Sequence, residues 1–396
     1  MLDCAYTFQF VAESTEICAN IMHRFWIRIA VLIFAAEGKC ATSTPKRIAV
    51  IGEGVIGVSS ALALIERDPR LNITVFFDTP FETTVSYGPA GLYRVDKIED
   101  SKNFHFRPYA KRAFARYAKL FRELPASETG VNLVSGHILS TNLTALVEQD
   151  EIYGDIVYNF HYLREDEMQQ FAPQEDEGHV FAIHYTAYTT EGGKYVPWMK
   201  RQLLAKGVRF IQRRISNLNE LYNDFDVIVN CAGLNGGKLA GDGDDRNMFP
   251  IRGIIFEVNA TWHHHFLFKD FTTFSIPTTD KVFIGSVKQP GRSDLEITQL
   301  DRDDILGRYY KLQPTFKAIY SFEWSGLRPG RYGGIRLEMT TVRFPVPRTR
   351  SLRNSGERVV QIVHNYGHGG HGFSVSWGCA EVVADLVIGN STSRRH

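Results

Sequence analysis

Glycine and histidine alternate near the C-terminus, in a run that could hold a flat, electron-rich ligand. The run reads YGHGGHG over residues 366–372, and the apolar stretch that follows, from Ser374 to about Ile388, is typical of a helix. Glycine allows the backbone to bend sharply and to approach a ligand closely. A helix that begins there offers unpaired N–H groups and a partial positive charge. The run therefore favours a site for a carbonyl edge or an anion, and a solvent-exposed glycine loop is the alternative.

A second glycine pattern lies near the other end of the chain. Residues 46–78 follow the order strand, GxGxxG, helix, strand and acid, which is the pattern of a dinucleotide-binding βαβ unit. Gly52 is expected to make the tight turn, Gly54 to leave room for a pyrophosphate, and Gly57 to let the helix pack closely on the strand. Asp78 is expected to accept hydrogen bonds from the adenosine ribose.

The elements that must position these glycines are scattered along the chain. Strands of the nucleotide-binding type are expected at residues 48–51, 73–77, 226–230 and 359–363. From Ile251 onward the pattern changes to alternating strands, which favours an antiparallel sheet. The expected fold class is therefore α/β, with a Rossmann-like nucleotide-binding domain interleaved with a mostly antiparallel-sheet substrate domain.

Size and composition indicate an ordinary globular protein. The chain has 396 residues, of which 44% are hydrophobic and 22% are charged, and both fractions are usual for a globular fold. A formal net charge of +1 provides no basic field for nucleic acid, and no DNA- or RNA-binding motif is present. The triplet His263-His264-His265 is not spaced like a metal site, so no metal is expected.

Residues 1–45 are expected to be a leader that lies outside the fold. A basic tripeptide that starts at Met22 precedes an apolar run over residues 25–36 and a small-residue stretch over 38–43, which is the order of a secretory signal peptide. The apolar run is short for a membrane span. Either Met22 is the real start, or the segment is an uncleaved anchor.

Two further signals agree with passage through the secretory pathway. N-x-S/T sequons occur at Asn72, Asn142, Asn259 and Asn390. The C-terminal sequence SRRH is not a peroxisomal address of the S-K-L type. The protein is therefore expected to be secreted and extracellular, or to reside in the secretory-pathway lumen, without a stable membrane span and outside the peroxisome.

Four motifs occur together in one order along the chain. They are the N-terminal fingerprint, NCAG over residues 230–233, GLRP over residues 326–329, and the glycine–histidine run continuing through WGCA at 377–380. This set resembles the D-amino-acid oxidase and D-aspartate oxidase family over about residues 46–388, and is closest to a secreted D-aspartate oxidase. The resemblance implies tightly bound FAD, which accepts a hydride from the substrate α-carbon and is reoxidised by oxygen to give hydrogen peroxide. The imino acid then hydrolyses to a 2-oxo acid and ammonia, and no catalytic side chain is expected beyond the flavin.

The resemblance also implies how the domains and the cofactor contacts are distributed. The FAD domain is expected from residues of about 46–95, 195–250 and 328–390, and the substrate domain mainly from about 96–194 and 251–327. Thr83 and Thr84 are expected near the cofactor phosphates. The helix start at 372–374 is expected at the flavin pyrimidine edge, where a partial positive charge stabilises a reduced, anionic flavin. The full set of further FAD contacts is Val55, Ile56, Ala90, Gly91, Gly233, Gly369, Gly370, Gly372, Phe373 and Ser374.

The same resemblance assigns the substrate α-carboxylate to Arg328. A guanidinium fork suits planar, bidentate recognition of a carboxylate, whereas an ordinary surface arginine is the alternative. Because Pro329 follows, Arg328 is expected on a stiffened turn. The backbone carbonyl of Gly370 is expected to face the substrate amine.

Three cations expected near the pocket favour a substrate with an acidic side chain. They are Lys269, Lys288 and Arg94. Two departures count against this preference: Phe274 replaces a family tyrosine whose hydroxyl would touch the substrate carboxylate, and Asp96 replaces a histidine of the D-aspartate oxidases. The expected substrates are D-aspartate and D-glutamate. The alternatives are an oxidase of neutral D-amino acids and a secreted flavoprotein without turnover, with a glycine- or sarcosine-type amine oxidase and an NAD dehydrogenase less favoured.

Overall fold

The computed structural model describes residues 44–95, 106–171, 178–260, 262–314, 320–345 and 357–389. Lys46–His396 forms one compact unit. The leader, Asp96 and Asn390 lie outside the described residues, so the predictions made for them stay predictions. Within the described ranges, no helix combines the length and the apolar character that a bilayer crossing requires.

Six of the described strands form a mostly parallel sheet. Their order is β14 (Arg336–Pro345), β15 (Glu357–Tyr366), β7 (Val227–Asn230), β1 (Arg47–Ile51), β2 (Asn72–Phe77) and β6 (Arg209–Gln212). Every neighbouring pair is parallel except β14 with β15. The central strands β1 and β7 are short, apolar and almost wholly buried, as strands covered on both faces must be.

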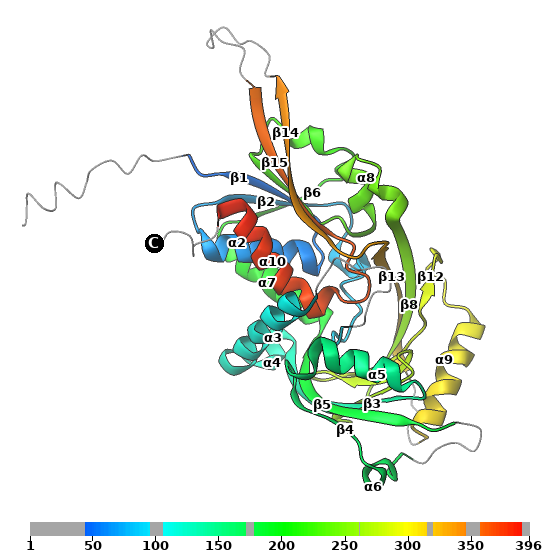
Figure 1. The fold of residues 1–396 in the computed structure, drawn as a ribbon. Helices are drawn as coiled ribbons and strands as arrows, with labels where there is room; N and C mark the ends of the chain where they lie inside the picture. The colour runs from blue at the N-terminus through cyan, green and yellow to red at the C-terminus, as the bar shows by residue number, and fades with distance from the viewer. Residues whose placement is uncertain are drawn as a thin grey trace, which may run out of the picture. The chain divides into compact units, whose positions relative to one another are not determined.

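Three helices cover one face of this six-stranded sheet. They are α2 (Val55–Arg67), α7 (Gly192–Ala205) and α10 (Gly372–Ile388), and α2 packs against both of the others (Figure 1). Ile48 and Val50 of β1 belong to the apolar cluster that contains these helices, whereas Ala49 and Ile51 belong to a separate cluster. This alternation follows from the two-residue period of a strand.

The second sheet is mostly antiparallel. Its strands run in the order β12 (Gln289–Pro290), β8 (Met248–Val258), β11 (Val282–Gly285), β10 (Thr273–Pro277), β9 (His265–Lys269), β3 (Val131–Ser140), β5 (Phe181–Thr190) and β4 (Tyr158–Tyr162), with β13 (Tyr320–Arg331) paired to β8. Only the β3–β9 pair is parallel among these described strands. Because the two sheets take strands alternately from the chain, the predicted interleaved α/β fold is confirmed.

The remaining helices are shorter or lie outside the two sheets. They are α3 (Phe106–Glu123), α4 (Ala126–Thr129), η1 (Phe81–Thr83), α5 (Leu143–Gln149), η2 (Asp150–Gly154), α6 (Glu165–Met168), η3 (Leu218–Leu221), η4 (Gly233–Asn235), α8 (Gly236–Ala240), η5 (Asp244–Asn247) and α9 (Gln299–Leu312). The long helix α3 packs against α10, and α9 packs against β10 and β11 of the second sheet (Figure 1).

The predicted turn at Arg328 and Pro329 is wrong. Both residues lie within β13, which runs antiparallel to β8 with Arg328 opposite Ile251. Pro329 faces Pro250 across the ladder, so neither residue has an N–H to leave unpaired. A proline is tolerated here because β13 pairs with β8 alone among the described strands and therefore has one unpaired edge.

The fingerprint glycines allow backbones to approach more closely than a side chain would permit. A Cβ on Gly57 would overlap the carbonyl oxygen of Gly52, and one on Gly52 would meet the carbonyl oxygen of Cys231. Gly52 also has a φ of +116°, a conformation that favours glycine. The start of α2, the end of β1 and the turn after β7 are therefore in direct backbone contact.

Gly57→Ala should destabilise the protein, because the added methyl group must push α2 away from β1. We expect a loss of about 1–3 kcal/mol or more in the free energy of unfolding, the usual cost of overpacking. Gly307→Ala is the matched control, since a Cβ there meets nothing within 4 Å and alanine favours the α9 helix. Urea unfolding of both variants measures the difference, and equal stability of the two would contradict the close-packing argument.

Candidate active site

A cavity of about 600 Å³ opens between the two sheets. Its wall is formed by the N-terminus of α2, parts of the segment 85–94, strands β8, β10 and β13, parts of the segment 286–290 and the run 367–374. The volume is that of a pocket for a small molecule or for one portion of a larger cofactor.

Most of the predicted site residues line this cavity. Those predicted to contact the cofactor are Val55, Ile56, Ala90, Gly91, Gly369, Gly370, Gly372, Phe373 and Ser374. Those predicted to contact the substrate are Arg328, Gly370, Arg94, Lys288 and Phe274. The predicted residues outside this wall are Gly52, Gly54, Gly57, Asp78, Thr83, Thr84, Gly233 and Lys269.

Two helix N-termini open onto the cavity. Helix α2 follows Gly54 and helix α10 follows His371, and neither of these N-cap residues makes a side-chain capping hydrogen bond. The N-termini of both helices therefore place a partial positive charge at the cavity wall, although the first N–H of α2, on Val55, donates to the hydroxyl of Ser86. One such end suits a diphosphate, and the other suits the electron-rich edge of a flavin. The residues present therefore fit FAD.

Ser86 completes the cradle at α2, although it was not among the predicted site residues. Its hydroxyl oxygen accepts a hydrogen bond from the backbone N–H of Val55 at 3.0 Å. A Cβ on Gly54 would lie 3.0 Å from the same oxygen, so any larger residue would have to displace the serine hydroxyl. A lone serine in a loop carries no sequence signal of this kind, because only the fold brings the segment after η1 back to the fingerprint.

The predicted cofactor residues outside the wall lie at or near the end of the six-stranded sheet. Asp78 is exposed just after β2, and the Gly52 N–H donates to the carbonyl of Phe76 in the same strand at 2.8 Å. The hydroxyls of Thr83 and Thr84 donate to backbone carbonyls within their own turn, at 2.8 Å each. In this structure these two threonines stabilise the η1 turn.

Arg328 is seated on the backbone of the second sheet. Its guanidinium occupies the space that a Cβ on Gly253 would take, so this glycine of β8 is required beneath it. A Cβ on Gly370 would lie 3.7 Å from Cδ of Arg328. Next in β13, the carbonyl of Pro329 accepts a hydrogen bond from the Gly369 N–H at 2.8 Å. The arginine and the glycine–histidine run therefore meet at the cavity.

The cavity receives two of the three predicted specificity cations. The guanidinium of Arg94 lies 4.9 Å from the ring centroid of Phe268 and 5.3 Å from that of Phe271, within cation–π range. Lys288 is exposed and also lines the cavity. Lys269 does not line it, because Phe268 does and neighbouring residues of a strand face opposite sides.

His364 and His368 are held in their neutral form. Complete burial, with a smaller contribution from His371, lowers the pKa of His368 to about 3. Burial and the nearby guanidinium of Arg336 lower the pKa of His364 to about 4. Both side chains are therefore neutral at pH 7, and the positive charge of the site comes from the arginines, the lysine and the helix ends.

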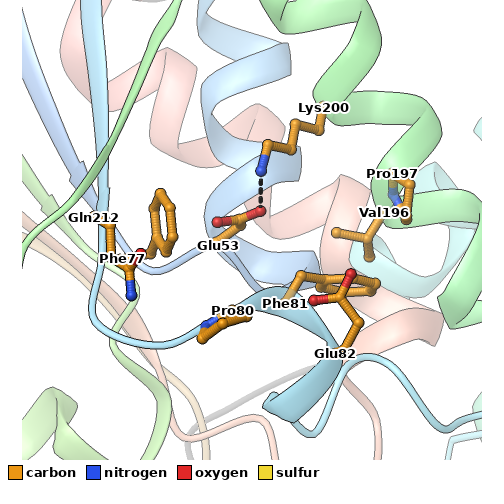
Figure 2. Close-up of a pocket in the computed structure, with 9 residues that line it drawn as sticks. All are labelled: Glu53, Phe77, Pro80, Phe81, Glu82, Val196, Pro197, Lys200 and Gln212. Carbon is orange, nitrogen blue, oxygen red and sulfur yellow. Dashed lines mark hydrogen bonds and ion pairs between the residues drawn. The ribbon is translucent and has the colours of Figure 1, made fainter.

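A smaller cavity of about 320 Å³ lies beside the fingerprint (Figure 2). It is lined by Glu53, Phe77, Pro80, Phe81, Glu82, Val196, Pro197, Lys200 and Gln212. The Glu53 side chain is 2% exposed, and its carboxylate forms an ion pair with Lys200 of α7 (Figure 2). A buried negative charge thus lies in the loop expected to face a diphosphate, and Lys200 neutralises it.

Fold and site together define an FAD-binding oxidoreductase. Residues 47–386 match the family described as DAO, FAD dependent oxidoreductase, and the chain belongs to that family. FAD is therefore its cofactor, in agreement with the two helix N-termini at the cavity and the glycine cradle.

Two curated relatives cover almost the whole described unit. The protein named D-aspartate oxidase 2 of Caenorhabditis briggsae is 48% identical over 343 residues, which is 86% of this chain and 97% of that one. The human protein named D-aspartate oxidase is 33% identical over 345 residues, 86% of this chain and 94% of its own. The solved glycine oxidase of Geobacillus kaustophilus is similar in fold, with a TM-score of 0.67 at 18% identity over 87% of this chain and 95% of its own.

Lys200→Met should weaken FAD binding and lower stability, because it leaves the Glu53 carboxylate buried and unneutralised. Removing one partner of a fully buried pair costs about 3–5 kcal/mol, and we expect less here because the Lys200 side chain is 32% exposed. FAD titration by fluorescence and urea unfolding measure the two effects.

The double variant Glu53→Gln/Lys200→Met is the control for charge, since it removes both members of the pair. It should recover most of the lost FAD affinity. A double variant as weak as Lys200→Met alone would show that Lys200 acts through packing instead.

Proposed function

We propose that this protein oxidises acidic D-amino acids, converting D-aspartate and D-glutamate to the 2-oxo acid, ammonia and hydrogen peroxide. The observation that carries the proposal is one cavity lined by Arg328, Arg94 and Lys288 beside the uncapped end of α10. High identity to proteins named D-aspartate oxidase, over most of both chains, supports the same substrate class.

Different residues of the cavity wall bind different groups of the substrate and so orient it. Arg328 takes the α-carboxylate in a bidentate grip, and the carbonyl of Gly370 accepts a hydrogen bond from the amine. When bound, FAD supplies the acceptor for the α-hydride and passes the electrons on to oxygen. The N-terminus of α10 stabilises negative charge at the edge of the ring, which makes the acceptor stronger.

The distal carboxylate is recognised by Arg94 and Lys288. Arg94 is held at its backbone and its side chain. Its N–H donates to the hydroxyl of Ser374 at 3.1 Å, and that hydroxyl donates to the Arg94 carbonyl at 2.8 Å. The Arg94 guanidinium lies over two aromatic rings. Lys288 is exposed and therefore reaches the substrate from the side open to solvent. Because Arg94 is fixed and Lys288 is exposed to solvent, the two cations together can contact the distal carboxylate of either D-aspartate or the longer D-glutamate.

The apolar part of the wall favours a second candidate, an oxidase of neutral D-amino acids. Phe268, Phe271 and Phe274 all line the cavity and would contact an uncharged side chain. Peroxide release by FAD-loaded protein beginning near Thr42 separates the candidates, with D-Asp, D-Glu, D-Ala, L-Asp and sarcosine as substrates. Turnover confined to D-Asp and D-Glu supports the proposal. Turnover of D-Ala alone supports the neutral oxidase, and no turnover by a yellow, FAD-loaded protein supports a flavoprotein without activity.

Lys288→Ala should raise the KM for D-Asp by about tenfold, which corresponds to one charge-assisted hydrogen bond at an exposed site, and should leave D-Ala unaffected. Lys269→Ala is the matched control, because it removes the same charge from a residue of β9 that lies outside the cavity wall. Steady-state kinetics with both substrates measures the difference. Equal losses for D-Asp and D-Ala in Lys288→Ala would contradict the distal-carboxylate role.

Arg328→Ala should reduce kcat/KM for every D-amino acid by about 100-fold or more, because a buried carboxylate would lose its charge-assisted partner. The flavin absorbance of the purified variant should persist, since the helix ends that fit FAD are unchanged. Loss of FAD together with activity would instead assign Arg328 a role in cofactor binding.

We further propose that the residues before Thr44 direct the protein into the secretory pathway. The basic, apolar and small-residue order of residues 22–43 supports this address. Expression of the full chain in eukaryotic cells, followed by N-terminal sequencing of protein in the medium, is the test. Protein retained in the cells with Met1 or Met22 at its N-terminus would argue against secretion.

A further inference from the structure

Ser286 lies beside Arg328 on the wall of the large cavity. It is 4% exposed, and its hydroxyl oxygen accepts a hydrogen bond from Nη2 of Arg328 at 3.4 Å. Two further guanidinium contacts, to the carbonyls of Arg252 and Val287, are also 3.4 Å long. A carboxylate held on this guanidinium would therefore lie within reach of the Ser286 hydroxyl.

The main chain of Ser286 is fixed from two sides. Its N–H donates to the carbonyl of Thr272 at 2.6 Å, and its carbonyl accepts from Nη2 of Arg308 at 2.8 Å. Nη1 of Arg308 donates to the hydroxyl of Thr273 at 2.6 Å, so α9 clamps the segment after β11 to the start of β10. Because the backbone is already in place, the hydroxyl can meet a ligand without further ordering.

Phe274 points to the same place from β10. It lies opposite Gly285 in the β10–β11 ladder, and its Cζ would be 3.0 Å from a Cβ on that glycine. A tyrosine at this position would carry its hydroxyl on that ring tip, beside Gly285, the residue that immediately precedes Ser286 on the same cavity wall. The hydroxyl that Phe274 lacks can therefore be replaced by one from the neighbouring strand end.

We propose that Ser286 is a substrate-binding residue whose hydroxyl donates a hydrogen bond to the α-carboxylate held by Arg328. The hydroxyl oxygen lies 3.1 Å from the carbonyl of Val287, to which it donates in this structure. Rotation about the Cβ–Oγ bond turns the proton to a ligand, while the oxygen stays in place and continues to accept from Arg328. The identity of the carboxylate rests on the proposed function, but its binding does not require turnover.

Binding of malonate to FAD-loaded protein tests this contact, because malonate carries carboxylates but no amine to oxidise. The titration is followed by the change in flavin absorbance. Ser286→Ala should weaken malonate binding by about tenfold, the effect of one hydrogen bond to a charged acceptor. Ser286→Thr keeps the hydroxyl and should bind within about twofold of the native protein. Ser325→Ala is the control, since that hydroxyl donates to the carbonyl of Leu295 and lies outside the cavity wall.

Unchanged malonate affinity in Ser286→Ala overturns the proposal. So does a loss that Ser286→Thr fails to restore, because packing and not the hydroxyl would then be responsible. If Ser286→Ala does not fold, Phe274→Tyr in the native background decides. A gain of less than about twofold supports the proposal, whereas a gain of about tenfold shows that the carboxylate lacked a hydroxyl donor. If the protein shows no turnover but its variants bind malonate as predicted, only the proposed function is rejected and the Ser286 contact stands.

Discussion

One backbone hydrogen bond joins the two halves of the site. The Gly369 N–H donates to the carbonyl of Pro329, and this bond ties the loop after β15 of the six-stranded sheet to β13 of the second sheet. The loop can lie this close because it carries little side-chain bulk: a Cβ on Gly367 would crowd Arg331, and one on Gly370 would touch Arg328. The N-terminus of α10 and the guanidinium of Arg328 consequently face one cavity.

The wall of that cavity carries positive charge, which suits several anionic groups. The N-termini of two helices, together with Arg328, Arg94 and Lys288, supply positive charge that suits the diphosphate and ring of FAD and the carboxylates of the proposed substrate. His364 and His368 add no charge at neutral pH, because burial lowers the pKa of both side chains. Glu53 of the fingerprint lines the smaller cavity and carries a negative charge. Its ion pair with Lys200 neutralises that charge.

Local patterns predicted the fold well but placed several side chains poorly. The fingerprint, the apolar strands and the C-terminal run each have a periodicity or a glycine spacing that depends only on nearby residues. The turn expected at Arg328 failed because its partner strand, β8, lies far away in the sequence and supplies the pairing. Lys269 was assigned to the pocket by its position in the chain, but which face of β9 meets the cavity is set by the sheet.

Residue patterns alone were enough to predict an FAD enzyme with two interleaved sheets and to predict that Arg328 and the glycine–histidine run would lie at one site, and both line one cavity. These properties depend on backbone conformation and short-range spacing, which neighbouring residues impose. Only the tertiary structure decided which hydroxyls and cations stand at the cavity: Ser86 and Ser286 enter it, whereas Thr83 and Lys269 do not. That choice depends on strand register and on clamps such as Arg308, which join residues that no local pattern connects.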